Sequence, residues 1–197
     1  MKADKIILIG CGGHARSVAD VLLFNNPAAE IIFVDANATN GEKILGFPVL
    51  KKIPAGAANI HCAAGDNEKR KTLWRQTNIS VVSKDAYISP SAKIGRGVFI
   101  GHRAHIGPLT EIGDGCIINT SSVIEHESKV GNFSHISVGT LICGRCKIGG
   151  NVFAGAGSVV KDGITVRSNV TVGAGASVVK NITKAGVYVG VPAVKRK

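Results

Sequence analysis

An aliphatic residue occurs at every sixth position between residues 88 and 178, and this spacing constrains the fold more than any other feature of the chain. The sixteen positions are Ile88, Ile94, Ile100, Ile106, Ile112, Ile118, Ile124, Val130, Ile136, Ile142, Ile148, Ala154, Val160, Val166, Val172 and Val178. The residue four places after each of them is usually small, and glycine often follows directly. Neither a helix, with a period of about 3.6 residues, nor a strand, with a period of about two, produces this pattern. A fixed period of this length predicts a repeat architecture.

Three six-residue units form one coil of eighteen residues, a triangular turn with a short parallel strand on each side. The aliphatic residue points to the axis and stacks on its equivalents above and below, and the small residue fills the remaining corner. Adjacent coils pair at strand spacing, roughly 4.8 Å. Contacts between neighbouring coils therefore hold most of the prism together. The pattern predicts a parallel β-helix domain over residues 84–197, with a C-terminal tail.

Residues 1–83 lack the repeat and alternate between strand and helix patterns. Residues 5–9, 31–34, 59–63 and 79–82 are predicted to form strands, and helices are predicted to follow Gly13 and to span residues 68–76. This order predicts a separate α/β domain of the Rossmann-like βαβ type, with a small parallel sheet.

A glycine-rich turn follows the first predicted strand. Residues 10–15 match the pattern G-x-G-x-x-A, in which Gly12 and Gly13 let the backbone approach a phosphate at the start of a helix. Asp35 ends the next strand, 23 residues beyond Gly12, where it is placed to bind a ribose or a base. His14 either contacts the ligand or caps the helix. NAD, a single nucleotide and a purely structural turn all fit the motif. A domain of about eighty residues is too short for both halves of a dinucleotide-binding fold, so its length favours a single nucleotide.

The chain carries a net charge of +11, with basic clusters at residues 69–71 and 195–197. Two Tyr and one Trp provide few platforms for base stacking, so phosphorylated small molecules are expected as ligands in preference to nucleic acid. The apolar run at residues 6–9 is too short for a signal peptide or a membrane span. We therefore expect a cytoplasmic protein without a membrane partner.

Cysteine and histidine spacing gives no support for a metal site. Cys143 and Cys146 form a C-x-x-C pair, but Cys146 occupies a small-residue slot of the repeat and is predicted to be a packed interior thiol. A zinc ribbon needs a second such pair. The His102-x-x-His105 spacing also does not match the three-histidine zinc site of hexapeptide-type carbonic anhydrases. We expect no metal.

The chemistry must come from residues outside the repeat slots, and the run Glu125-His126-Glu127 is the strongest candidate. Carboxylates beside an imidazole fix its tautomer and raise its basicity, as a general base requires. A solvated histidine beside surface acids is the alternative interpretation.

Several motifs together resemble the sialic-acid O-acetyltransferase-like branch of hexapeptide acyltransferases. The chain is most similar to bacterial nucleotide-sugar N-acetyltransferases that act on UDP-4-amino-4,6-dideoxy sugars in bacillosamine-type glycan synthesis. The motifs are residues 10–15, Gly65-Asp66-Asn67 with Arg70, residues 119–127, residues 133–139 and the ending Gly190-Val191-Pro192-Ala193. The resemblance implies a left-handed β-helix and a homotrimer that binds acetyl-CoA between neighbouring subunits.

The resemblance also implies roles for individual residues. His126 would be the general base, polarised by Glu127. The acetyl-CoA site would contain His135 near the acetyl carbonyl, the Gly144 N–H at the oxyanion, and the backbones of Ala156 and Ala174 against the pantetheine arm. The nucleotide-sugar site would contain Gly12, Gly13, His14, Asp35 and Asn67.

The leading hypothesis is therefore acetyl-CoA-dependent N-acetylation of the 4-amino group of a UDP-linked 4-amino-4,6-dideoxy sugar. O-acetylation of a sialic acid or related sugar needs the same base and remains the nearest alternative. A non-catalytic nucleotide-sugar-binding trimer and an NAD oxidoreductase are further alternatives. Asp35 is followed by Ala36, where some relatives carry a second Asp, and this difference leaves the nucleotide base open.

Overall fold

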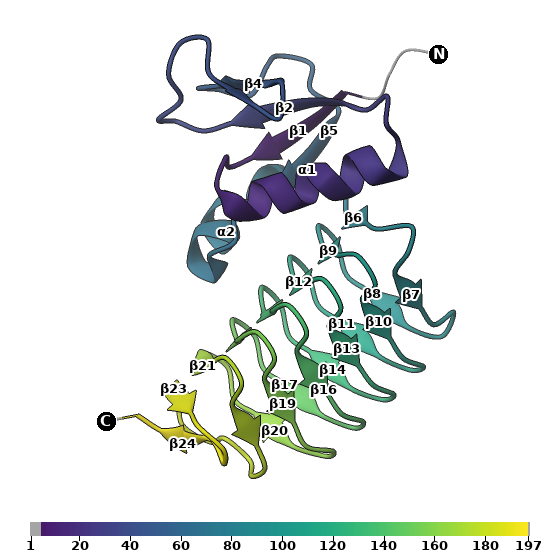
Figure 1. The fold of residues 1–197 in the computed structure, drawn as a ribbon, viewed down its shortest axis with the longest axis vertical. Coiled ribbons are helices and arrows are strands. Elements are labelled where there is room, and N and C mark those ends of the chain that lie inside the picture. Colours follow the sequence, from purple (N-terminus) through teal and green to yellow (C-terminus); the bar gives the residue numbers. More distant parts are fainter. Residues whose placement is uncertain (1–4, 197) are drawn as a thin grey trace.

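The structure is a computed structural model that describes residues 5–196, and it consists of a small α/β layer packed on a long coiled prism (Figure 1). The first helix lies between the N-terminal sheet and the prism. This architecture, an α/β unit followed by a left-handed parallel β-helix, confirms the predicted fold class. The division into residues 1–83 and 84–197 stays a prediction.

The N-terminal sheet has the strand order β3-β4-β2-β1-β5. Its elements are β1 (Lys5–Ile9), α1 (Gly13–Asn25), β2 (Glu30–Val34), β3 (Lys43–Ile44), β4 (Phe47–Leu50), β5 (Asn59–Cys62), α2 (Asn67–Leu73) and the 3₁₀ helix η1 (Trp74–Gln76). The strands β1, β2, β4 and β5 are parallel, and β3 pairs antiparallel with β4 at the edge. The β3–β4 hairpin lies where the sequence pattern predicted only a loop.

One predicted strand belongs to a different sheet. Residues 79–82 were expected to close the N-terminal sheet, but β6 (Val81–Val82) pairs with the prism strand β9 instead. Val81 is buried together with residues of α1 and with Phe99 of the prism. A short apolar run does not specify its pairing partner, so the sequence pattern could not distinguish the two sheets.

The prism consists of three parallel sheets, which we name by the order in which the chain visits them. Sheet I contains β6, β9 (Phe99–Ile100), β12 (Ile117–Ile118), β15 (His135–Ile136), β18 (Phe153–Ala154), β21 (Val170–Val172), β23 (Gly186–Val189) and β24 (Val194–Lys195). Sheet II contains β7 (Tyr87–Ile88), β10 (His105–Ile106), β13 (Val123–Ile124), β16 (Leu141–Ile142), β19 (Val159–Val160) and β22 (Ser177–Val178). Sheet III contains β8 (Lys93–Ile94), β11 (Glu111–Ile112), β14 (Lys129–Val130), β17 (Lys147–Ile148) and β20 (Thr165–Val166).

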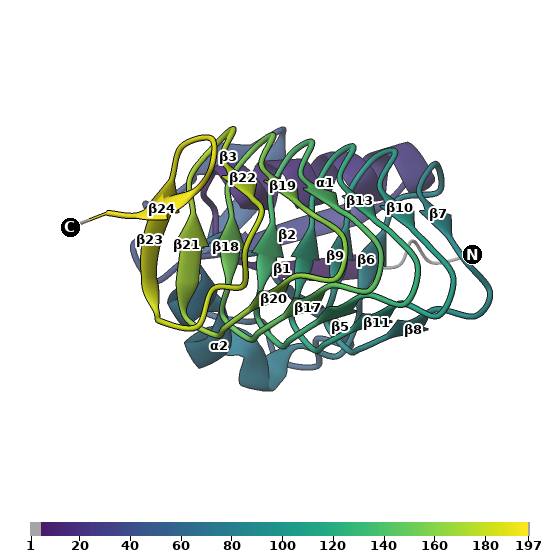
Figure 2. The ribbon, with the colours of Figure 1, turned by 90° about the horizontal axis from the view of Figure 1, so that it is seen from below.

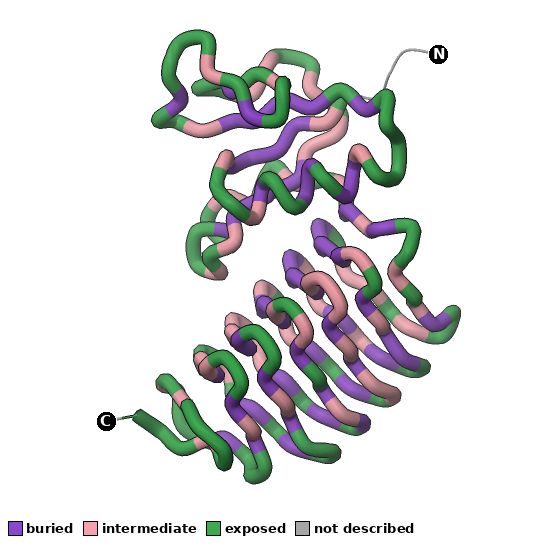
Figure 3. Tube along the Cα trace, viewed as in Figure 1, coloured by how far each residue is buried: buried purple, intermediate pink, exposed green. Residues whose placement is uncertain are grey.

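The six-residue repeat explains this prism. Fourteen of the sixteen aliphatic positions are buried, and Ile88 and Ile94 of the first coil are half-buried against the same core. Strands eighteen residues apart pair in register, as in the ladder His135, Phe153, Thr171. Viewed along another direction, the coils stack as nearly equal turns (Figure 2), and buried segments alternate with exposed ones along every coil (Figure 3).

The C-terminal end of the prism is closed by a hairpin. Strand β23 continues sheet I in parallel, and the short strand β24 folds back on it in antiparallel pairing. A short terminal strand that carries Lys195 protects the open edge of a sheet from further pairing. Among residues 5–196, no helix has the length and apolar character that a membrane crossing requires.

Candidate active site

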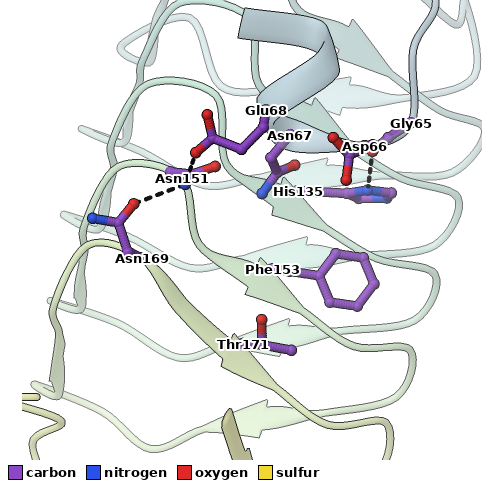
Figure 4. A pocket seen from close by; sticks show the side chains of 9 residues that line it. All are labelled: Gly65, Asp66, Asn67, Glu68, His135, Asn151, Phe153, Asn169 and Thr171. Carbon is purple, nitrogen blue, oxygen red and sulfur yellow. Dashed lines mark hydrogen bonds between the residues drawn. The ribbon is translucent and has the colours of Figure 1, made fainter. Parts of the chain in front are cut away.

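A cavity of about 530 Å³ lies between the start of α2 and the outer surface of sheet I (Figure 4). Its lining residues are Gly65, Asp66, Asn67, Glu68, His135, Asn151, Phe153, Asn169 and Thr171. Three of them, His135, Phe153 and Thr171, stand above one another because β15, β18 and β21 pair in register. The cavity therefore joins the N-terminal layer to three successive coils of the prism.

His135 is held in this cavity as a neutral imidazole. Its Nδ1 lies 3.3 Å from the Gly65 carbonyl oxygen, which can only accept, so Nδ1 carries the hydrogen. Its Nε2 lies 3.2 Å from the side-chain amide nitrogen of Asn119 and accepts from it. Burial, followed by the nearby Arg70 charge, lowers the pKa of His135 to about 4. At neutral pH the ring therefore has one tautomer and no charge.

His14 lies beside His135 and does not cap α1. The Gly12 N-cap position receives no side-chain hydrogen bond, and the His14 ring centroid lies 6.1 Å from that of His135 and 4.9 Å from that of Phe99. The His14 Nε2 is buried and has no hydrogen-bond partner among residues 5–196. Burial and the neighbouring His135 lower the pKa of His14 to about 3. The interface between the two layers thus contains two neutral imidazoles.

A second cavity, of about 640 Å³, lies at the carboxyl ends of β1 and β2. Asp35 lines it together with Lys51, Lys52 and Lys69. The Asp35 carboxylate accepts a hydrogen bond of 3.0 Å from the Asn37 N–H, and this bond is the main reason why the pKa of Asp35 is lowered. An ionised carboxylate beside three lysines suits a ligand that carries both hydroxyl groups and phosphates.

The predicted nucleotide-sugar residues divide between these two cavities. Asp35 lines the lysine-rich cavity, and Asn67 lines the cavity on sheet I. Gly12 and Gly13 are exposed where α1 begins, and a Cβ atom at either position would meet nothing within 4 Å. The His14 ring lies near His135 of the prism, and its Cβ lies close to Gly65 of the N-terminal layer.

The predicted base, His126, lies on the turn between sheet II and sheet III. Its Nδ1 is 3.1 Å from the Glu127 carboxylate, which accepts the Nδ1 hydrogen and leaves Nε2 with its lone pair. Glu127 has a φ of 60°, the left-handed conformation that recurs at the turns of the prism. The His126 side chain is 39% exposed, so Nε2 is accessible to a second molecule.

Gly144 lies one coil further along the same corner, beneath the His126 ring. The Arg145 N–H donates to the His126 carbonyl at 2.9 Å, and a Cβ atom on Gly144 would lie 2.5 Å from His126 Cε1. Among the described residues, the Gly144 N–H has no hydrogen-bond acceptor. The same is true of the N–H groups of Ala156 and Ala174, which are exposed at the corner between sheets I and II.

Unused donors of this kind are common at the corners that follow sheets I and II, where the N–H groups of His126, Val138 and Asp162 also lack an acceptor among the described residues. The corner between sheets III and I differs. At the equivalent position in the corner between sheets III and I, the residue eighteen places later supplies an acceptor, as Ser168 does for the Gly150 N–H at 3.0 Å. Eighteen places after Ala156 the chain has Ala174, which offers no such side chain. Eighteen places after Gly144 it has Asp162, whose carboxylate accepts from Arg145 Nη2 at 2.7 Å instead. The predicted acetyl-CoA positions therefore present backbone N–H groups that a ligand can use.

One chain alone does not bring the predicted acetyl-transfer residues together. His126 and Gly144 lie at the corner between sheets II and III, whereas His135 is on sheet I and Ala156 and Ala174 follow it at the corner between sheets I and II. The whole width of sheet II separates the two groups.

Several residues in or beside the cavity on sheet I carried no role in the sequence analysis. Asn119 lies in a quoted motif without an assigned contact, and Phe153 and Thr171 follow His135 at intervals of eighteen residues. The interval of eighteen residues could have predicted that these side chains lie together, because the repeat places such residues side by side on adjacent strands of one sheet. Within residues 5–196, no group of three or more His, Cys, Asp or Glu side chains is arranged to hold a metal ion.

Two family models match the chain. Residues 5–77 match the family described as the PglD N-terminal domain, and residues 82–188 match the family described as the GMPPB C-terminal domain.

Solved structures match almost the entire chain. The acetyltransferase domain of PglB from Neisseria gonorrhoeae FA1090 is 30% identical with a TM-score of 0.91, over 98% of this chain and 100% of that one, and it has also been solved with acetyl coenzyme A. The perosamine N-acetyltransferase from Caulobacter crescentus, in complex with CoA and GDP-perosamine, is 29% identical with a TM-score of 0.91, over 98% and 97% of the two chains. A curated relative, the uncharacterized protein L142 of Acanthamoeba polyphaga mimivirus, is 36% identical over 105 residues. The chain covers 21% of the length of that relative, and the match includes 49% of this chain.

The left-handed prism defines the fold, and the comparisons identify the family. The chain belongs to the hexapeptide-repeat acetyltransferases of the bacillosamine and perosamine type. The predicted family, the predicted enzyme class and acetyl-CoA as co-substrate are thereby confirmed.

Proposed function

We propose that the protein transfers the acetyl group of acetyl-CoA to the 4-amino group of a UDP-linked 4-amino-4,6-dideoxy sugar. The observation that carries this proposal is the arrangement of His126, Glu127 and Gly144. An imidazole with its Nδ1 hydrogen on a carboxylate has a basic Nε2. That nitrogen lies over Gly144, whose backbone N–H has no acceptor among the described residues. A base beside an oxyanion donor is what acyl transfer to an amine requires.

The proposed reaction needs no further group from the protein. The neutral 4-amino nitrogen attacks the thioester carbonyl while His126 Nε2 takes one of its protons. The Gly144 N–H stabilises the oxyanion of the tetrahedral intermediate, and its collapse breaks the C–S bond. The imidazolium then returns the proton to the departing thiolate, which leaves CoA as a free thiol. A positioned base of this kind contributes on the order of 10²- to 10⁴-fold.

The nucleotide part is assigned to the lysine-rich cavity. Asp35 would accept from a ribose or base, and Lys51, Lys52 and Lys69 would balance the diphosphate. The related perosamine N-acetyltransferase has been solved with a GDP-linked sugar, so the choice of UDP rests on the resemblance of the sequence motifs. His135, neutral and bonded to the turn at Gly65, is assigned to the region of the acetyl carbonyl.

We further infer a homotrimer, because it would complete the site. The outward residues of sheet II include Tyr87, Val123, Leu141 and Val159, whereas sheet III presents Lys93, Glu111, Lys129 and Lys147. Three prisms packed with sheet II around a threefold axis would cover the apolar face. Each corner between sheets II and III would then meet the corner between sheets I and II of the next subunit. His126 of one subunit would face Ala156 and Ala174 of its neighbour.

The substrate assignment is tested by release of free thiol from acetyl-CoA. The acceptors are UDP- and GDP-linked 4-amino-4,6-dideoxy sugars, beside free and CMP-linked sialic acids. We expect turnover with the UDP-linked amino sugar, loss of turnover in His126→Ala, and a partial loss in Glu127→Gln. Turnover with sialic acids alone would replace the proposal by O-acetylation. Sedimentation tests the trimer, and a monomer at working concentration would refute the shared site.

A further inference from the structure

Arg70 on α2 is a fully buried cation without a carboxylate partner. Its exposure is 1%, and none of the ion pairs among the described residues includes it. The guanidinium instead donates to the carbonyl oxygens of Gly115 (2.7 Å), Ala64 (3.1 Å), Gly65 (3.2 Å) and Phe133 (2.8 Å) and to the side-chain oxygen of Asn67 (2.8 Å). These bonds use all five N–H donors that an arginine side chain has.

The five acceptors come from both layers of the molecule. Gly115 and Phe133 lie eighteen residues apart, on two successive coils at the corner between sheets III and I. The other three acceptors belong to the turn at residues 64–67, which connects β5 to α2. Trp74, one turn further along, packs edge-to-face on Phe133 with ring centroids 5.5 Å apart. Arg70 therefore fixes the position of the turn at residues 64–67 relative to the prism.

The turn at residues 64–67 also contributes to the cavity on sheet I. The Gly65 carbonyl accepts from Arg70 and also from His135 Nδ1, so the same oxygen fixes the His135 tautomer. The Asn67 amide is held at both ends, because its oxygen accepts from Arg70 while its nitrogen donates to the Val152 carbonyl at 3.2 Å. Two residues expected to contact the two substrates are thus positioned by one guanidinium.

The charge of Arg70 acts on the same site. Burial lowers the pKa of Arg70 to about 10, which leaves the group charged at neutral pH. After burial itself, this charge is the next cause that lowers the pKa of His135, and it contributes to the low pKa of His14. A fixed cation close to both rings keeps them neutral.

We propose that Arg70 is a positioning residue that fixes the turn at residues 64–67 against the prism and holds His135 as the neutral Nδ1–H tautomer. The identity of the substrates in this inference rests on the proposed function. The geometry does not depend on it. Lysine cannot replace this arginine, because an ammonium has three donors and lacks the planar fork that reaches acceptors on two coils and a turn.

The kinetic test uses Arg70→Lys and Arg70→Met, with Arg75→Met as the matched control. Arg75 is exposed on η1, five residues from Arg70. We expect both Arg70 variants to raise the KM for the nucleotide sugar by at least about tenfold and to lower kcat by on the order of 10²-fold, the cost of a shift of about 1 Å in a reacting group. The control should match the wild type. If Arg70 only stabilises the fold, the variants will melt earlier but keep wild-type kcat and KM while folded.

The second test needs no substrate, and so it separates failure of this inference from failure of the proposed function. Nitrogen-15 NMR of the histidine side chains reports the tautomer and pKa of each ring. We expect His135 in the wild type as the Nδ1–H tautomer, and in Arg70→Met with a raised pKa and mixed tautomers. Arg70→Lys retains the charge, so it should lose the single tautomer while the pKa stays low. Unchanged His135 signals in a folded Arg70 variant would overturn the proposal, and Arg70→Lys serves if Arg70→Met does not fold.

Discussion

Adding one methyl group at Gly144 should separate the chemistry of His126 from the stability of the fold. In Gly144→Ala the new Cβ would lie 2.5 Å from His126 Cε1, 2.6 Å from Nε2 and 2.9 Å from a carboxylate oxygen of Asp162. Carbon atoms in contact are normally about 3.5–4.0 Å apart. The imidazole must therefore move by about 1 Å. Both crowded groups are ends of side chains, and the His126 ring is 39% exposed, so the move requires little repacking.

A displacement of about 1 Å in a catalytic group costs on the order of 10²-fold in rate. That factor corresponds to about 2.7 kcal/mol on the activation barrier. The residue at 144 does not have a positive φ, so alanine introduces no backbone strain there. We therefore expect kcat for thiol release to fall on the order of 10²-fold while the thermal midpoint stays close to that of the wild type.

The matched control for this prediction is Gly150→Ala. Gly150 occupies the same position in the next six-residue unit, and the nearest atom to its added Cβ, the Asn132 carbonyl oxygen, would lie 3.2 Å away. The control should keep its kcat. Wild-type kcat in a folded Gly144→Ala protein would refute the reasoning, because the base would then not be the imidazole that covers Gly144.

Three further predictions concern stability and substrate binding. Burial lowers the pKa of His61 to about 4 from an ordinary 6.5, so its neutral form stabilises the fold above about pH 6.5 and this contribution is lost as the pH falls toward 4. In His61→Gln, the free energy of unfolding measured with urea should change less between about pH 6 and about pH 5, by up to about 1.4 kcal/mol per pH unit. The same pH dependence as in the wild type would contradict the burial argument. Ile118→Ala truncates a side chain with 0% exposure in the prism core, and denaturant unfolding should show that the free energy of unfolding falls by about 2–5 kcal/mol. A fall of less than about 1 kcal/mol would mean that the core collapses around the cavity. Asp35→Asn should raise the KM for the nucleotide sugar about tenfold with little change in kcat, since a hydrogen bond to a charged group is worth about 1.5–3 kcal/mol, and an unchanged KM would remove Asp35 from that site.

The prism could be predicted from the sequence almost residue by residue. The repeat requires an aliphatic side chain at the axis of every strand, and Cys146 occupies an interior slot where its thiol donates to the Lys161 carbonyl at 3.2 Å. Contacts within one corner also follow from the chain itself. His126 and Glu127 are neighbours in sequence, so their pairing needed only the geometry of one turn.

Contacts between the layers could not be predicted in this way. The Gly65 carbonyl that fixes His135 is 70 residues away in the chain, and every residue of a sequence has such a carbonyl. Arg70 lies in a run of three basic residues, which in the sequence indicates phosphorylated ligands. It is instead buried, and backbone oxygens from three segments converge on it. The strand at residues 81–82 joins the prism for a similar reason, since pairing partners are set by packing and not by local composition.

The most direct test of the central claim is the identity of the bond formed in the product. The enzyme is given acetyl-CoA labelled with carbon-13 at the carbonyl and a UDP-linked 4-amino sugar labelled with nitrogen-15 at the amine, and the product is observed by NMR. The proposed function predicts a labelled carbonyl carbon coupled directly to the labelled nitrogen, and no such product in His126→Ala. A labelled ester on a sugar hydroxyl, or the same amide formed at the wild-type rate in His126→Ala, would contradict it.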